Sequence, residues 1–346
     1  MRSKHNTILV TGGSGFIGSN FIYNYLSNHK GSIVNLDALT YAGTGGNLDS
    51  LSEETRYKFI HGSINDLSLL KKIFSKYKFD AVIHFAAESH VDRSIDGPKI
   101  FMETNILGTF YLLEAVRKYW NSLNKRYQDN FKFIHVSTDE VFGSLDFNAK
   151  SFFEESNYRP NSPYSASKAS SDHIVRSYFK TFGLPAIITN CSNNYGPYQF
   201  PEKLIPLILF NALNNKPLPI YGDGLHIRDW LYVEDHCKAL VDILLKASPG
   251  STYNIGGNNE QTNIDVVKSI CGHLDTLKPR RVGKYSELIS YVADRPGHDK
   301  RYSIDASKIQ KELGWSPKET FGSGISKTIK WYLNNQSWVK RIMRYS

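Results

Sequence analysis

The sequence has few cysteines and no long apolar run. The three cysteines among its 346 residues, Cys191, Cys237 and Cys271, are too widely spaced for a disulfide framework or a metal motif. We therefore expect buried thiols in a reducing cytoplasm and no metal site. No apolar stretch approaches the roughly 20 residues that span a membrane, and residues 1–5 carry no signal-type segment. These absences predict a cytoplasmic localisation and no membrane partner.

Acidic residues are outnumbered by basic ones, 33 against 42, which gives a formal net charge of +9. The basic residues are dispersed along the chain instead of clustering, so we expect a solvated surface that favours small anions and no nucleic-acid partner. A non-catalytic scaffold that binds NAD or RNA remains the alternative from a different functional class. The length suits two domains or one enlarged domain.

A glycine-rich turn lies near the N-terminus. The apolar strand Thr7 to Thr11 leads into residues 12–18, GGSGFIG, and then into a helical pattern. Glycines in this setting let the backbone approach a pyrophosphate at the positive end of the helix, which indicates dinucleotide binding. A second strand, Ser32 to Leu36, ends at Asp37, nineteen residues past Gly18. A carboxylate there would accept hydrogen bonds from a ribose diol and favour NAD over NADP; a turn cap is the structural alternative.

Strand and helix patterns alternate about six times up to Thr189, including one long helix expected from Pro98 to Trp120. This alternation predicts an α/β fold, a doubly wound parallel Rossmann sheet, with a second, smaller α/β lobe. We expect the NAD-binding domain to comprise residues 1–189, with 229–251 and about 301–313 packing back on it. The smaller lobe would then comprise residues 190–228, 252–300 and about 314–340.

A cluster of reactive side chains follows the apolar run Phe131 to Val136, in the segment from Ser137 to Val141. Ligands of open α/β sheets bind outside the carboxyl ends of the strands, so Asp139 and Glu140 are candidates for acid–base chemistry. An N-cap with a solvated neighbour is the structural alternative. Tyr164 and Lys168, four residues apart, share one helix face, where the ammonium would lower the pKa of the phenol.

The glycine turn, the Tyr164-x-x-x-Lys168 pair and the second lobe resemble the extended short-chain dehydrogenase/reductase superfamily, in the branch that acts on nucleotide sugars. Six further blocks resemble its dTDP-sugar 4,6-dehydratases: residues 88–94, 137–141, 189–197, 201–206, 228–233 and 294–299. The resemblance runs from about residue 6 to residue 338. Three positions depart from the pattern. Ser63 replaces a usual Asp, the loop Ala42 to Asn47 has extra glycine, and Phe142 replaces a more common Tyr; the first two bear on the adenine end of NAD.

This resemblance implies an NAD-dependent lyase that converts a dTDP-glucose to a 4-keto-6-deoxy sugar and water. Tyr164 would take the proton of the 4-hydroxyl, with Thr138 bonded to the same oxygen, while carbon 4 gives a hydride to NAD. Glu140 would then act as base at carbon 5 and Asp139 as acid on the departing 6-hydroxyl. The catalytic set is Thr138, Asp139, Glu140, Tyr164 and Lys168.

The resemblance also implies two binding sets. The cofactor set is Gly12, Gly15, Phe16, Ile17, Gly18, Asp37, Leu39, Thr40, Ser63, Ile64, Phe85, Ala86, Ala87, Ser89, Thr104, Tyr164, Lys168 and Asn194. The substrate set is Ser89, Thr138, Asn193, Lys203, Leu204, Pro219, Tyr221, Arg228, Asn263, Asp294, Arg295 and His298. The implied partners are a small-molecule nucleotide sugar and a second copy of the chain, in a homodimer formed through a four-helix bundle that includes the Tyr164 helix. Another NAD-dependent dehydratase or a 4-epimerase of UDP-sugars is the alternative within the superfamily.

Overall fold

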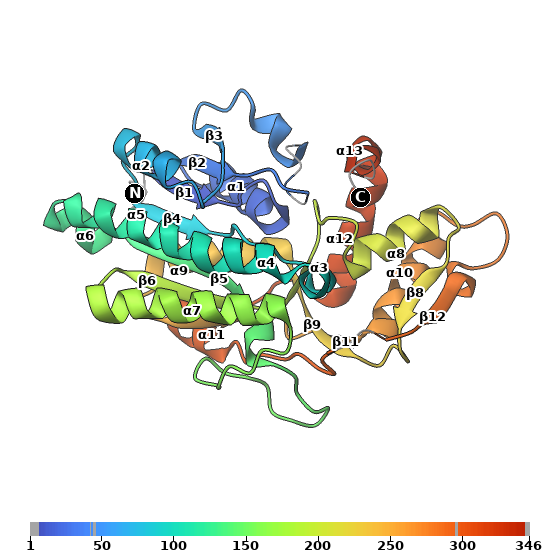
Figure 1. The fold of residues 1–346 in the computed structure, drawn as a ribbon. Coiled ribbons are helices and arrows are strands. Elements are labelled where there is room, and N and C mark those ends of the chain that lie inside the picture. The colour runs from blue at the N-terminus through green and yellow to red at the C-terminus, as the bar shows by residue number, and fades with distance from the viewer. Residues whose placement is uncertain (1–6, 42, 44–45, 295–296, 343–346) are drawn as a thin grey trace.

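The computed structural model describes residues 7–41, 43, 46–294 and 297–342. Its centre is a sheet of seven strands in the order β10-β6-β5-β4-β1-β2-β3, every neighbouring pair parallel (Figure 1). The strands are β1 (Thr7–Thr11), β2 (Ser32–Asp37), β3 (Tyr57–His61), β4 (Ala81–His84), β5 (Lys132–Thr138), β6 (Ala186–Cys191) and β10 (Thr252–Ile255). The order reverses between β1 and β4, as in a doubly wound Rossmann sheet, and this confirms the predicted fold class.

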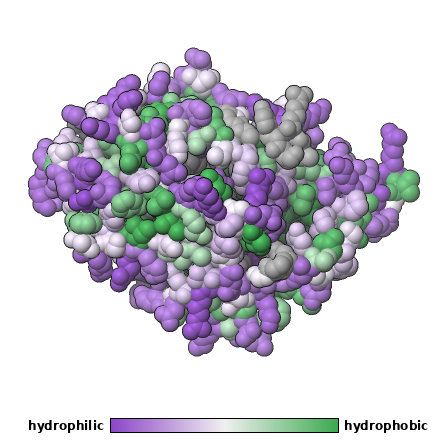
Figure 2. All heavy atoms as spheres, viewed as in Figure 1, coloured by the Kyte–Doolittle hydropathy of each residue, from purple (hydrophilic) through white to green (hydrophobic). Residues whose placement is uncertain are grey.

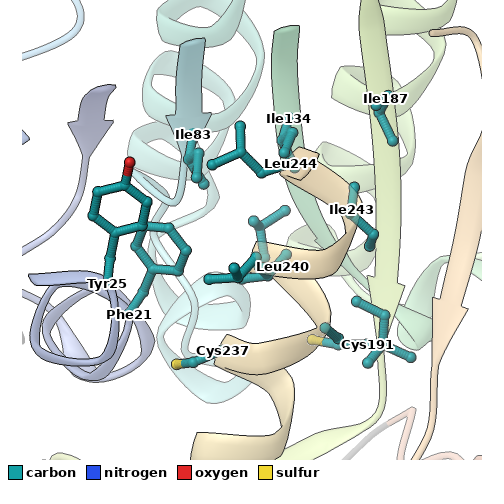
Figure 3. Packing of buried hydrophobic residues seen from close by; sticks show 14 of the residues in the cluster. Phe21, Tyr25, Ile83, Ile134, Ile187, Cys191, Cys237, Leu240, Ile243 and Leu244 are labelled. Atoms are coloured by element: carbon teal, nitrogen blue, oxygen red, sulfur yellow. The ribbon is translucent and has the colours of Figure 1, made fainter. Parts of the chain in front are cut away.

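Helices cover both faces of this sheet because successive strand residues point to opposite sides. Ile8 and Val10 of β1 pack in one core with α1 (Phe16–Asn28), α9 (Val233–Lys246) and α11 (Ser307–Leu313). Leu9, between them, packs in a second core with α2 (Leu67–Lys76), α5 (Thr109–Ser122) and α7 (Pro163–Phe182). Figure 3 shows the first core, where Phe21 of α1 and Leu240 of α9 lie beneath the strands. Each fully buried side chain of this size contributes about 1.5–3 kcal/mol to folding.

The smaller lobe combines short strands with four helices around its own core. Its strands are β7 (Asn193–Tyr195), β9 (Ile227–Tyr232) and β11 (Glu260–Thr262) in one sheet, and β8 (Leu218–Tyr221) and β12 (Ile289–Val292) in another. Its helices are α8 (Leu204–Leu213), α10 (Asn263–Leu277), α12 (Phe321–Asn334) and α13 (Gln336–Ile342). Ile205, Ile270 and Ile325 are buried together at its centre.

One expectation from the sequence, a domain boundary, is wrong. The segment from residue 252, assigned to the smaller lobe, begins with β10, which pairs with β6 at the edge of the main sheet. A short apolar pattern like that of β10 is typical of strands in either lobe. Only the pairing of β10 with β6 assigns it to the main sheet.

The helix expected over 98–120 is confirmed as one continuous helical stretch, with a π-helical turn inside it. It divides into α4 (Pro98–Phe101), a π-helical turn Met102–Gly108, and α5. Within the turn, the Asn105 side chain bonds both backbone groups of Glu88 at 2.9 and 3.0 Å and also donates to Ser167 Oγ at 2.8 Å. Such turns frequently mark functional sites.

The two remaining short helices are α3 (Val91–Asp96) and α6 (Lys125–Asn130). Within the described residues, no helix combines the length and the apolar character that a bilayer crossing demands.

Candidate active site

A cavity of about 410 Å³ opens at the carboxyl ends of the central strands. Residues that end or follow six strands of the main sheet line it, namely Gly12, Asp37, Gly62, Phe85, Thr138 and Cys191. The segment leading into α8 closes another side. The cavity therefore lies at the switch point of the sheet, where ligands of such folds bind, and extends to the smaller lobe.

The glycine turn between β1 and α1 is closely packed on one side and open on the other. Gly12 has a φ of 72°, and a Cβ there would lie 2.5 Å from the Ala86 nitrogen. A Cβ at Gly18 would lie 2.4 Å from the Gly12 oxygen, whereas one at Gly15 would meet only that oxygen, at 3.4 Å. The first turn of α1 carries no acidic side chain. This cradle fits the pyrophosphate of a dinucleotide.

Asp37 closes the end of β2 beside this turn. Its carboxylate accepts the backbone N–H of Ser14 at 2.8 Å and that of Leu39, also at 2.8 Å. Burial raises the pKa of Asp37, while these two bonds oppose the shift. The turn-capping role therefore exists in this structure, and it leaves lone pairs on the carboxylate for a ribose diol, because a carboxylate has about four acceptor sites.

The structure gathers the predicted cofactor set almost completely. All its members line the cavity except Leu39, whose N–H instead holds Asp37. Asn194 is oriented by His236, whose Nδ1 lies 2.9 Å from its Oδ1. Burial lowers the pKa of His236 to about 3, so this imidazole is neutral.

The acid–base corner is built where β5 ends and one 3-10 turn, Asp139–Phe142, begins. Thr138 caps this turn by accepting the Glu140 N–H at 3.3 Å, so the capping role falls to Thr138 and not to the carboxylates. Asp139 is 2% exposed, and its Oδ2 has no hydrogen-bond partner among the described residues. Burial raises the pKa of Asp139 well above its usual range, and the neighbouring Glu140 adds to the shift. These shifts favour the protonated form of Asp139, the form in which a general acid acts.

Tyr164 and Lys168 lie on the face of α7 that lines the cavity. The expected lowering of the Tyr164 pKa by the Lys168 ammonium is wrong, however. Burial raises the pKa of the Tyr164 phenol well above its usual value, and the charge of Glu140 adds to the shift. The Lys168 ammonium instead donates to the Val136 carbonyl at 2.9 Å, and burial lowers its pKa. Helical spacing places both groups correctly, whereas burial, which spacing does not report, dominates the protonation equilibrium of the phenol.

Asp172, one turn beyond Lys168 on α7, was not identified from the sequence. Its Oδ2 accepts from Ser137 and Tyr158, each at 3.0 Å, and from Asn190 at 3.2 Å. Burial raises its pKa to about 6, and the charge of Lys168 opposes the shift. Its position, four residues after Lys168 on the same helix face, was the available signal.

Glu202, also not identified, joins three segments at the cavity wall. Its carboxylate lies 3.1 Å from the Tyr41 hydroxyl and 3.2 Å from Arg93 Nε. The Arg93 guanidinium also stacks 3.7 Å from the centroid of the Tyr41 ring. Nothing in the local sequence links residues this far apart in the chain.

The predicted substrate set divides into two groups. Ser89, Thr138, Asn193 and Lys203 line the cavity, and Lys203 donates to the Ser89 carbonyl at 2.9 Å. Leu204 follows Lys203 at the start of α8 but does not line the cavity.

The second group gathers in the smaller lobe, outside the cavity lining. Pro219 and Tyr221 lie on β8, and the Tyr221 ring stands 6.1 Å from that of His298. His298 Nδ1 lies 2.6 Å from Asp294 Oδ1, and the His298 ring stacks on His226 at 3.8 Å. Ligating atoms of His226, Asp294 and His298 lie within 4.8 Å of one another, and His226 Nε2 lies 3.4 Å from Asp294 Oδ2.

Two further predicted contacts adjoin this second group: Arg228 is bonded to the residue that follows His298, and the Asn263 N–H donates to the His226 carbonyl at 3.0 Å. Arg228 is buried and donates to the Asp299 carbonyl at 2.9 Å. Its positive charge opposes the rise in the pKa of Asp139 that burial causes. Asn263 begins α10. Arg295 lies outside the described residues.

Comparison with known proteins agrees with this geometry. Residues 9–328 match the family model described as GDP-mannose 4,6 dehydratase. The chain is 56% identical to a dTDP-glucose 4,6-dehydratase of Escherichia coli, over 97% of this chain and 96% of that protein. Its fold is similar to the crystal structure of a dTDP-glucose 4,6-dehydratase from Bacillus anthracis in complex with NAD, with a TM-score of 0.86 and 47% identity over 97% of this chain and 99% of that chain. It is also similar to the crystal structure of a dTDP-glucose 4,6-dehydratase from Streptomyces venezuelae with NAD and a second ligand, with a TM-score of 0.88 and 43% identity over 97% of this chain and 99% of that chain. The chain therefore belongs to the GDP-mannose 4,6-dehydratase family, among the relatives named dTDP-glucose 4,6-dehydratase.

Proposed function

We propose that this protein is an NAD-dependent dTDP-glucose 4,6-dehydratase, which forms dTDP-4-keto-6-deoxy-glucose and water. The observation that carries the proposal is the corner where Asp139, buried and with a raised pKa, adjoins Glu140 and lines the same cavity as Tyr164. Two carboxyl groups with different environments suit one acid and one base, which elimination of water requires. A 4-epimerase has no use for such a pair.

The cavity fits NAD, because its glycine cradle accepts a pyrophosphate and Asp37 accepts a ribose diol. Bound NAD would supply a hydride acceptor for carbon 4 of the sugar and then a hydride donor for carbon 6, without being consumed. Tyr164 removes the proton of the 4-hydroxyl, and the Thr138 hydroxyl bonds the same oxygen. Burial and the charge of Glu140 raise the pKa of Tyr164, so a neighbouring positive charge would favour the phenolate that this step needs.

The elimination then belongs to the two carboxyl groups. The ketone at carbon 4 acidifies the hydrogen at carbon 5; Glu140 removes it as a proton and gives a proton back to carbon 5 when the hydride reaches carbon 6. Asp139 donates its proton to the departing 6-hydroxyl, which leaves as water. Burial of the acid beside the cavity favours its protonated form, from which it can donate.

Product analysis by mass spectrometry tests the activity and the nucleotide together. We would incubate the protein with dTDP-, UDP-, CDP- and GDP-glucose and expect a mass loss of one water with dTDP-glucose in preference to the others, without net accumulation of NADH. A product that retains its 6-hydroxyl would refute dehydration. Preferential turnover of UDP-glucose would favour the alternative, a UDP-sugar enzyme. Tight polynucleotide binding at physiological salt without sugar turnover would favour a scaffold.

We also propose that the protein forms a homodimer through the helices around α7. Ile100, Leu107 and Phe110 are 47%, 45% and 38% exposed on α4, the π-helical turn and α5. Figure 2 shows apolar residues gathered over α5 and α7 on the face presented to the viewer. Large apolar patches of this kind support a self-association surface.

The three free cysteines, all buried, support a reducing compartment such as the cytoplasm.

A further inference from the structure

The last helix of the described chain, α13, packs against a segment near the N-terminus, residues 46–51. The indole N–H of Trp338 donates to Asn47 Oδ1 at 2.8 Å, and both residues are buried. The Trp338 ring belongs to the smaller lobe, where its centroid lies 5.1 Å from that of Trp331 and 6.0 Å from that of Tyr332. The smaller lobe therefore reaches Asn47 through one buried hydrogen bond.

A second, exposed contact accompanies the first. Arg341 pairs with Asp49 at 2.6 Å and donates to the Gly46 carbonyl at 3.1 Å. A Cβ at Gly46 would lie 2.4 Å from the Arg341 guanidinium, so the helix and the segment are in close contact. Exposed ion pairs contribute little to stability, so the buried bond is the stronger candidate for a functional link.

Asn47 carries this contact to the glycine turn. Its side-chain amide donates to the Ser14 carbonyl at 2.9 Å, and its own carbonyl accepts from Tyr23 at 2.8 Å. The Ser14 N–H in turn donates to Asp37, and the Ser14 hydroxyl accepts from Asn35 at 3.1 Å. All three polar groups of Ser14 are therefore occupied.

These bonds form a continuous chain from Trp338 through Asn47 and Ser14 to Asp37. Ser14 belongs to the glycine turn, which would hold the pyrophosphate. Asp37 supplies the carboxylate that would bind the adenosine ribose. We propose that Trp338 is a positioning residue for the dinucleotide site, through which the smaller lobe holds the glycine turn in its binding geometry. The inference rests on the proposed NAD site and adds a residue more than 300 positions away from Asp37.

The test is a mutant cycle on NAD affinity, measured by titration calorimetry, together with the melting temperature of each protein. Trp338→Phe keeps the ring packing and removes the N–H, which strands the buried Asn47 oxygen. Asn47→Ala removes the same link from the other side. We expect each variant to bind NAD about tenfold more weakly, as loss of one buried hydrogen bond allows. Both changes break the same chain of hydrogen bonds. The double variant should therefore bind NAD no more weakly than whichever single variant has the lower NAD affinity.

Trp331→Phe is the matched control, since its ring belongs to the same aromatic cluster, and we expect its affinity to stay within about twofold of wild type. NAD affinity equal to wild type in Trp338→Phe, or fully additive effects in the double variant, would overturn the inference. If Trp338→Phe does not fold, the result with Asn47→Ala alone decides it by the same affinity criterion. Failure of the wild-type protein to bind NAD would instead refute the proposed cofactor.

Discussion

Thr138 Oγ1 lies 3.3 Å from one carboxyl oxygen of Asp139, while the other oxygen is buried and accepts no hydrogen bond from the described residues. A carboxylate left in that state would be costly, so the carboxyl group keeps its proton. The Asp139 carboxyl group therefore favours its protonated form beside the cavity. Its neighbour Thr138 contacts the same sugar in the proposed mechanism.

Replacement of both carboxyl groups should separate oxidation from elimination. In Asp139→Asn with Glu140→Gln, Tyr164 and Lys168 are intact, so mixing with dTDP-glucose should still reduce bound NAD in a single turnover. Elimination should slow by about 10²–10⁴-fold, the usual contribution of general acid–base groups. Stopped-flow absorbance of reduced nicotinamide and mass spectrometry of the quenched product measure the two steps.

The control for this experiment is Glu155→Gln, since Glu155 is an exposed acid outside the cavity lining. That variant should dehydrate at the wild-type rate. Normal dehydration by the double variant would mean that the acid and base roles are assigned to the wrong residues.

The raised pKa of Asp139 should make stability depend on pH. An acid whose pKa is higher in the folded state binds its proton more tightly there, so its contribution is complete below the unfolded pKa and is lost as pH rises through the folded pKa. Asp139→Asn removes this loss. The melting temperature of the variant should therefore exceed that of wild type increasingly as pH rises from the ordinary pKa of an Asp side chain, about 4, towards alkaline pH. A difference between the two proteins that stays constant across this range would argue that Asp139 does not titrate as proposed.

Asp37 should control cofactor affinity and choice. Asp37→Ala removes the acceptor for the ribose diol and leaves the N–H groups of Ser14 and Leu39 without their partner. NAD should bind at least about tenfold more weakly, the cost of about one buried hydrogen bond. Discrimination against NADP should shrink because the repelling charge is gone. Calorimetric titration with both dinucleotides measures the two effects.

Asp49→Ala provides the comparison for that variant, because Asp49 is an exposed acid in a nearby segment. Its NAD affinity should match wild type. Unchanged preference for NAD over NADP in Asp37→Ala would show that another group selects the cofactor.

The exposed apolar face should hold two chains together. Leu107→Glu places a charge on the proposed interface and should shift the protein from dimer to monomer in sedimentation velocity. Leu277→Glu, at the end of α10, is the matched control, since Leu277 is similarly exposed at 40% against 45%. The dimer should persist in this control. A monomeric wild type, or a Leu107→Glu variant that remains dimeric, would contradict the proposed interface.

Much of the site could be predicted because its signals are local. The glycine turn, its strand and its helix are contiguous, so the cradle at Gly12, Gly15 and Gly18 follows from residue type and order. Helical periodicity likewise places Tyr164 and Lys168 on one face of α7, and the structure puts both on the cavity wall.

Only the tertiary structure decided the electrostatics and the long-range contacts. The pKa values of Asp139 and Tyr164 rise because groups from several elements exclude water from them, and burial is a sum over neighbours that no short pattern contains. The same holds for the contacts of Glu202 with Arg93 and of Trp338 with Asn47, and for the pairing of β10 with β6. Periodicity determines which face a residue occupies, whereas chain packing determines what that face meets.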